Sequence, residues 1–206
     1  MQHTGAMVIL FAALMGVGLP ASGQDKKPVP PPKPKERAVI ETSMGTIDVD
    51  LYREDAPKTV DNFVRLAEKK YFDGLLFHRV ARGFVIQGGD PLGNGSGGQS
   101  IYGKPFEDEL NPSTPSYKQG YVKGVLAMAN RGPNTNTSQF FIVLSDAPWL
   151  PKNYTIFGKV VRGMDVAEQI GQVEIIPQLG PNDGKPKVEV VMKKVTIKKD
   201  TEQKTP

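Results

Sequence analysis

Residues 77–90 read Phe77-His-Arg-Val-Ala-Arg-Gly-Phe-Val-Ile-Gln-Gly-Gly-Asp90, in which two short apolar runs flank a glycine. Short runs of this kind, bounded by glycine, are typical of β-strands. If the two runs lie on adjoining strands, Arg79, Phe84 and Gln87 face one groove. A groove with an apolar floor and a few fixed polar groups is the usual form of a ligand pocket. The stretch therefore predicts a binding site built on paired strands.

The rest of the chain is also mainly strand-like. Residues 38–51 alternate between apolar and polar side chains around Ser43-Met44-Gly45, which predicts a β-hairpin. Two helices are expected, one after Asp55 as N-cap and Pro57, and one over residues 164–170. Further short runs predict an antiparallel barrel or sandwich, with strands at residues 75–80, 84–87, 125–128, 139–143, 156–161 and 188–198.

Four motifs in a fixed order carry a resemblance to a known family. They are Phe77–Asp90, the Gly-rich stretch 95–103, the stretch 128–142 (Met-Ala-Asn-Arg-Gly-Pro-Asn-Thr-Asn-Thr-Ser-Gln-Phe-Phe-Ile) and the stretch 149–160 with its Trp-Leu and Phe-Gly-Lys-Val. In sequence and spacing they resemble the cyclophilins, peptidyl-prolyl cis/trans isomerases, over essentially all of residues 38–199. The resemblance implies a mainly β fold, a closed eight-stranded antiparallel β-barrel with two capping α-helices.

The resemblance also implies a site, position by position. It makes Arg79 the catalytic arginine, with Phe84 and Gln87 beside it, and it places Trp149 at the pocket rim, where the family contacts cyclosporin. Gly95 and Ser96 should lie near a neighbouring pocket for residues before the proline. The remaining substrate-binding residues are expected around the proline ring (Phe84, Val85, Phe141, Leu150, Tyr154) and along the substrate backbone (Gln87, Ala129, Asn130, Gln139).

Two positions depart from the common family pattern. Val85 stands where methionine is frequent, and Tyr154 stands where many members have histidine, although tyrosine there is familiar in bacterial-looking relatives. Valine makes one pocket wall shorter and stiffer than the adaptable methionine would. Substrate preference and the affinity for cyclosporin, a candidate ligand, therefore depend on Val85.

The implied chemistry uses neither metal nor cofactor. Twisting an X-Pro bond removes the conjugation of the prolyl nitrogen, and a fixed guanidinium at Arg79 would then donate a stronger hydrogen bond to it. Proline-containing polypeptides are the expected partners. A second interpretation stays open, in which the domain is a chaperone or assembly module that holds proline-containing segments without depending on turnover.

Several other activities are disfavoured by the residues present. The chain has no cysteine and two histidines, His3 and His78. A serine hydrolase with His78 and Ser96 fails because Asn94 occupies the first glycine of G-x-S-x-G. Residues 93–98 satisfy G-x-G-x-x-G, but no helix is expected after them, so dinucleotide binding is rejected. The acidic run 107–109 is interpreted as a solvated turn rather than a metal site.

The basic charges of the chain are not spread evenly along it. The net charge is +4, with three more basic than acidic side chains in each of the segments 24–37 and 193–206, so the basic excess lies at the ends and nucleic-acid binding is not expected.

Residues 1–23 have an uncharged apolar run followed by small residues, which predicts a signal peptide and a periplasmic or secreted protein. Membrane association is expected only if this segment stays uncleaved. The predicted order is signal peptide (1–23), Pro/Lys-rich linker (24–37), isomerase domain (38–199) and polar tail (200–206).

Overall fold

The structure is a computed structural model that describes residues 36–199. The predicted signal peptide, nearly all of the predicted linker and the polar tail lie outside the described residues. The first strand begins at Glu36, two residues before the predicted start of the domain. Within residues 36–199, no helix is both long enough and apolar enough to cross a bilayer.

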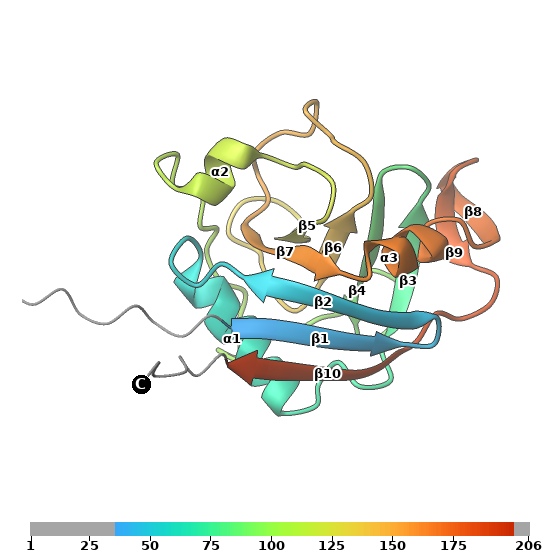
Figure 1. Cartoon of the computed structure of the whole chain (residues 1–206), viewed down its shortest axis with the longest axis horizontal. Coiled ribbons are helices and arrows are strands. Elements are labelled where there is room, and N and C mark those ends of the chain that lie inside the picture. The colour runs from blue at the N-terminus through green and yellow to red at the C-terminus, as the bar shows by residue number, and fades with distance from the viewer. Residues whose placement is uncertain (1–35, 200–206) are drawn as a thin grey trace, which may run out of the picture. The chain divides into compact units, whose positions relative to one another are not determined.

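Ten strands and three helices make up this part of the chain (Figure 1). In chain order they are β1 (Glu36–Thr42), β2 (Gly45–Leu51), α1 (Pro57–Glu68), β3 (Leu76–Ala81), β4 (Val85–Asp90), α2 (Pro115–Gln119), β5 (Val125–Met128), β6 (Phe140–Val143), β7 (Ile156–Arg162), α3 (Met164–Ile170), β8 (Ile175–Gly180), β9 (Asp183–Pro186) and β10 (Met192–Lys199).

Eight of these strands form a barrel. They pair antiparallel in the order β10-β1-β2-β7-β5-β6-β4-β3. The two end strands then meet: Leu76 bridges to Val191, and the Met192 amide donates to the Leu75 carbonyl at 2.7 Å. The predicted eight-stranded antiparallel barrel is thereby confirmed, and the hairpin at residues 43–45 is confirmed with it.

The interior of the barrel is packed with aromatic rings. Phe63 of α1 stacks on Phe72 with ring centroids 4.9 Å apart and meets the edge of Phe140 at 5.6 Å. The apolar face predicted for this helix is the buried one, since Val60 and Phe63 are both at most 2% exposed. α1 packs beside β10 and α3 beside β2, so both predicted helices cover the barrel. A third, five-residue helix, α2, was not predicted.

The start of α1 differs from the prediction. Ala56, not Asp55, is the N-cap residue, and its side chain makes no cap hydrogen bond. The Glu109 carboxylate instead accepts from the amides of Lys58 and Thr59, at 3.0 and 2.8 Å. Asp55 accepts from the Ser116 amide at 2.8 Å. A helix N-terminus needs acceptors for its free amides, and here a distant loop supplies them.

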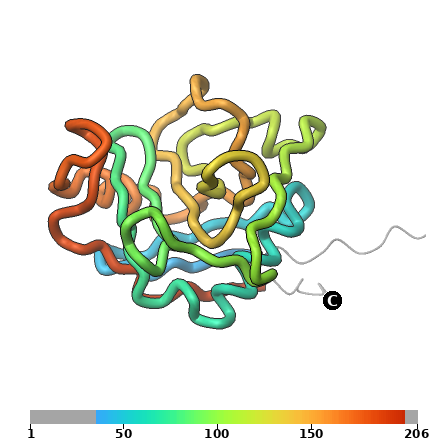
Figure 2. The backbone as a smooth tube through the Cα atoms, turned by 180° about the vertical axis from the view of Figure 1, so that it is seen from behind, coloured from blue at the N-terminus to red at the C-terminus, as the bar shows by residue number. Residues whose placement is uncertain are grey.

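A further hairpin, β8–β9, extends the sheet beyond β3 and was also missed. Val80 pairs with Gly184 and Ala81 with Asp183, which fixes the hairpin against the strand that carries Arg79. Seen from behind, its red and orange tube runs beside the green β3–β4 segment (Figure 2). Proline and glycine inside a run argue against a strand, and β8 and β9 contain both. This explains why the pattern did not reveal them.

Candidate active site

A row of paired residues places the predicted catalytic side chains together on the outside of the barrel. Arg79 on β3 lies opposite Gln87 on β4, and Gln87 lies opposite Phe141 on β6. Phe141 in turn faces Ala127 on β5. Directly opposed residues share a face of the sheet, so these side chains project to the same side. The expected groove on adjoining strands is therefore present.

A pocket of about 260 Å³ opens over this row. It is lined by nine of the thirteen predicted site residues: Arg79, Phe84, Val85, Gln87, Ala129, Asn130, Phe141, Leu150 and Tyr154. A second pocket of about 240 Å³ adjoins it, sharing Gln87, Ala129 and Asn130, and Gly95 and Gln139 line this second pocket. The division into a main and a neighbouring pocket agrees with the sequence-based expectation.

The Arg79 guanidinium is held by two neighbours. Its Nε and Nη2 donate to the two carboxylate oxygens of Asp183, at 2.8 and 2.6 Å, and Nη1 donates to Gln87 Oε1 at 3.0 Å. Arginine has five N–H donors, so two remain for a ligand among the contacts within residues 36–199. Arg79 is in an ion pair, yet it still lines the pocket.

A chain of amides links this guanidinium to the neighbouring pocket. Gln87 Nε2 donates to Gln139 Oε1 at 2.9 Å, and Gln139 Nε2 donates to the carbonyls of Gly95 and Gly97 at 3.0 and 2.7 Å. Arginine can only donate and a carbonyl can only accept, so each glutamine has one permitted orientation. The two pockets are thus joined by a directional hydrogen-bond chain.

Asp90 holds the glycine-rich loop that carries Gly95. Its buried carboxylate accepts from the amides of Leu92, Asn94 and Gly95, at 2.9, 3.1 and 2.6 Å. Burial alone would raise the pKa of Asp90, but the surrounding amides outweigh it and hold the pKa below its usual value. The loop is therefore fixed by a carboxylate that stays ionised.

His78 and Ser96 do not form a catalytic pair. The imidazole of His78 is 5% exposed, and neither ring nitrogen has a hydrogen-bond partner among the described residues. Burial lowers the pKa of His78, so the ring is neutral at physiological pH. The Ser96 hydroxyl donates to Asn94 Oδ1 at 2.6 Å instead. The exclusion of a serine hydrolase agrees with this geometry.

The acidic run 107–109 is not the solvated turn expected from the sequence. Asp108 accepts from the Asn134 amide at 2.8 Å and from Asn136 Nδ2 at 2.7 Å, which ties down the loop that leads to β6. Glu109 caps α1, and only Glu107 is exposed, where it pairs with Lys58. The pattern could not identify these partners because they lie far away in sequence.

The apolar side of the pocket is formed by aromatic and aliphatic side chains. Phe141 meets Tyr154 edge-on at 5.7 Å, and the buried Tyr121 clamps the Tyr154 backbone by accepting from its amide and donating to its carbonyl, both at 2.9 Å. Trp149 is 65% exposed and tilts over Phe84 at 4.7 Å. Trp149 therefore lies above the pocket edge rather than in its wall.

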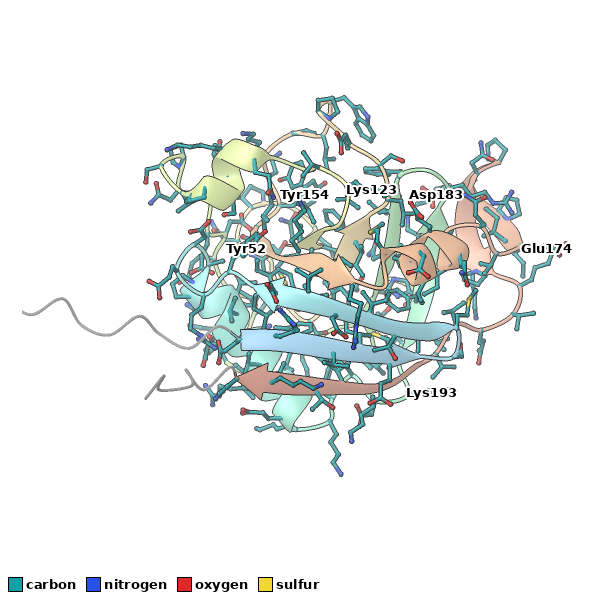
Figure 3. All side chains as sticks on the ribbon, viewed as in Figure 1. Tyr52, Lys123, Tyr154, Glu174, Asp183 and Lys193 are labelled. Atoms are coloured by element: carbon teal, nitrogen blue, oxygen red, sulfur yellow. The ribbon has the colours of Figure 1, made fainter. Side chains whose placement is uncertain are left out.

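The structure brings together most, but not all, of the predicted site. Ser96 is exposed and lines neither pocket. Two residues that sequence reasoning missed lie in the network: Asp183, which pairs with Arg79, and Arg131, whose Nη2 donates to the Gly95 carbonyl at 3.0 Å. Asp183 follows Arg79 by 104 residues and occurs in an Asn-Asp-Gly turn sequence, so no local signal marks it. In Figure 3 Asp183 lies beside the β3–β9 edge and Tyr154 on the side nearer α2.

Comparison with known proteins points to the same family along the whole described domain. A family model described as cyclophilin type peptidyl-prolyl cis-trans isomerase/CLD matches residues 37–197. Peptidyl-prolyl cis-trans isomerase-like 1 of Rhizopus delemar is 51% identical over 140 residues, which are 68% of this chain and 82% of that protein. The human protein of the same name is 50% identical over 144 residues, 70% of this chain and 84% of that protein.

Solved structures agree. A cyclophilin type peptidyl-prolyl cis-trans isomerase of Cryptosporidium parvum matches with a TM-score of 0.71 and 36% identity, covering 80% of this chain and 98% of that one. A second structure of that protein was determined in the presence of the dipeptide Ala-Pro, and its TM-score is 0.70. From the barrel, the pocket over β3, β4 and β6 and these matches, the chain belongs to the cyclophilin-type peptidyl-prolyl cis-trans isomerases and catalyses cis/trans isomerisation at X-Pro bonds.

Proposed function

We propose that Arg79 is the catalytic residue of this isomerase, with Phe84 and Gln87 beside it. The observation that carries the proposal is a guanidinium in the wall of a pocket with one apolar side, and two of its N–H donors have no partner within residues 36–199. Its two neighbours, Asp183 and Gln87, fix its plane. The group is therefore oriented before any substrate binds.

The mechanism follows from the barrier to rotation. An X-Pro bond resists twisting by about 18–20 kcal/mol because the nitrogen lone pair is delocalised into the carbonyl. At the twisted transition state that delocalisation is lost, so the prolyl nitrogen becomes a better acceptor. A donor from Arg79 then binds the transition state more strongly than either ground state, which lowers the barrier. No nucleophile takes part.

The remaining pocket residues bind substrate in this proposal. The proline ring lies against the apolar wall, where burial of its methylene groups supplies affinity. That wall is Phe84, Val85, Phe141, Leu150 and Tyr154, and the substrate backbone is held by Gln87, Ala129, Asn130 and Gln139. The residue before the proline extends toward the pocket beside Gly95, with Ser96 next to it. Proline-containing polypeptides are thus the ligands.

Turnover and affinity must be measured separately to test the role of Arg79. We expect Arg79→Ala to lower protease-coupled turnover of an Ala-Pro peptide by about 100-fold or more, as removal of one preorganised donor does. Affinity, followed by the fluorescence of Trp149, the single tryptophan, should change little. Arg82→Ala is the matched control, because the Arg82 side chain is exposed and, among the described residues, its guanidinium donates only to the Val173 carbonyl. Equal turnover in Arg79→Ala and the parent would refute the catalytic role and favour a pure binding module.

We also propose that cyclosporin occupies the same pocket, against its apolar side, and that Trp149 contacts it. The support is the exposed indole tilted over Phe84 at the pocket edge. Cyclosporin should displace an Ala-Pro peptide and change Trp149 fluorescence, and Val85→Met should strengthen binding by giving the wall a more adaptable side chain. A titration without any displacement would contradict this assignment.

We propose further that the protein is a bacterial, exported member that acts in the periplasm or outside the cell on exported proteins. The support is the uncharged apolar stretch at residues 5–19 followed by the small residues Ala21 and Gly23, together with Tyr154, a residue familiar at this position in bacterial-looking relatives. Sequencing the N-terminus of the protein from a fractionated host should find a mature chain beginning near Gln24 outside the cytoplasm. An intact N-terminus in the membrane fraction would indicate an anchor instead.

A further inference from the structure

The β8–β9 hairpin touches the proposed active site through one side chain, Asp183. Its two carboxylate oxygens accept from Nε and Nη2 of Arg79, a bidentate pair of 2.8 and 2.6 Å. Both side chains are mostly shielded, at 28% and 22% exposed. Bidentate pairing with a carboxylate fixes the plane of a guanidinium as well as its position. Asp183 thus constrains the group more tightly than a single hydrogen bond would.

The register of the sheet explains why these two residues meet. Asp183 lies directly opposite Ala81, and Arg79 lies two residues before Ala81 on the same strand. Residues two apart on a strand share a face, so Arg79 and Asp183 form a diagonal cross-strand pair. The Arg82 amide also donates to the Asn182 carbonyl at 2.8 Å, which anchors the turn. The carboxylate is therefore positioned by backbone pairing rather than by a flexible loop.

Asp183 holds Arg79 from behind the pocket. Asp183 does not line the main pocket, whereas Arg79 and Gln87 do. The carboxylate accepts from Nε and from one N–H of Nη2, which leaves both N–H groups of Nη1 and the second N–H of Nη2. Gln87 accepts from one N–H of Nη1. The other end of the chain of amides, at Gly95 and Gly97, is likewise fixed.

We propose that Asp183 is a positioning residue for the isomerisation, which acts by orienting the Arg79 guanidinium toward the prolyl nitrogen of the twisted substrate. The inference rests on the catalytic role proposed for Arg79. Asp183 lies outside the lining of the main pocket, so its removal should lower the rate of rotation and leave peptide binding nearly unchanged. The hairpin β8–β9 then contributes to catalysis and is more than an extension of the sheet.

Two substitutions separate orientation from folding. Asp183→Asn keeps the shape of the side chain and suits a turn, but it loses the charge and one acceptor of the pair. Asp183→Glu keeps a bidentate carboxylate. We expect kcat for an Ala-Pro peptide to fall about tenfold in Asp183→Asn, because small misplacement of a catalytic group costs one to two orders of magnitude. KM should stay within about twofold, and Asp183→Glu should regain at least about half of the parent kcat.

Lys187→Gln is the control for the hairpin. It breaks the exposed ion pair between Lys187 and Glu174, 2.9 Å long, and Glu174 lies well apart from Asp183 in Figure 3. This variant should keep the parent kcat and KM. An unchanged or raised kcat in Asp183→Asn would overturn the proposal, and so would equal losses in the Asn and Glu variants or a loss confined to KM. If Arg79→Ala itself kept full turnover, the role of Arg79 would fail first, so the two failures are distinguishable.

Discussion

The clamp, meaning the two hydrogen bonds between the Tyr121 hydroxyl and the Tyr154 backbone, allows a quantitative prediction for Tyr121→Phe. The Tyr121 ring is 5% exposed, and burial raises the pKa of its hydroxyl to about 12. That hydroxyl accepts from the Tyr154 amide and donates to the Tyr154 carbonyl, each at 2.9 Å. The substitution removes both hydrogen bonds and leaves the ring packing intact.

The size of the effect follows from these two bonds. Each intramolecular hydrogen bond contributes about 0.5–1.5 kcal/mol net, so Tyr121→Phe should lower the free energy of unfolding by about 2 kcal/mol. For a domain of this size the melting temperature should fall by about 4–8 °C. Tyr154 lines the pocket, so KM for an Ala-Pro peptide should rise, while kcat stays close to the parent because Arg79 is untouched.

Urea denaturation of Tyr121→Phe beside Tyr117→Phe tests this reasoning. Within residues 36–199 the Tyr117 hydroxyl makes no hydrogen bond, and the ring contacts Lys152 through its face. The control should therefore lose less than about 0.5 kcal/mol, as a surface substitution does. If both variants lost the same stability, or if Tyr121→Phe lowered kcat and left KM alone, the clamp would not act as described.

Two further predictions concern stability. Burial lowers the pKa of His78, so as the pH falls below about 6.5 the unfolded chain takes up a proton before the folded one does. The free energy of unfolding should therefore be highest above that pH and decline toward pH 5. Chemical denaturation of His78→Gln should show a weaker decline, and a decline equal to that of the parent would exclude His78 as its source. Glu109→Ala removes the acceptor for two amides at the start of α1. The free energy of unfolding, measured by urea denaturation, should fall by about 1–2 kcal/mol, while kcat per folded molecule stays unchanged. A urea midpoint equal to that of the parent would contradict the capping role.

The sequence predicted the barrel and the wall of the pocket well, for a physical reason. Strands β4, β5 and β6 read as short apolar runs because both of their faces are largely buried, one in the core and one under the pocket. Residues that line the pocket from such strands, Val85 and Phe141 among them, have their positions set by the strand register. The motif resemblance then located Arg79 and Gln87 without knowledge of their partners.

What the sequence could not predict depends on contacts between distant segments. Asp55 looked like a cap for α1, but Glu109 supplies that cap from a loop some 50 residues away. Asp108 appeared solvated because Asn134 and Asn136, which it binds, carry no signal of pairing. The β8–β9 hairpin was hidden by its prolines and glycines, and with it the carboxylate of Asp183 that holds Arg79.

The role of Arg79 is tested most directly by the rate at which a bound Ala-Pro peptide interconverts between cis and trans, measured by NMR exchange spectroscopy at saturating peptide. Arg79→Ala should slow this bound-state rotation by about 100-fold or more at nearly unchanged affinity. The double variant Arg79→Ala/Asp183→Asn, which leaves no unpaired carboxylate, should be equally slow. A bound-state rate equal to that of the parent in either variant would contradict the claim that the Arg79 guanidinium lowers the barrier to rotation.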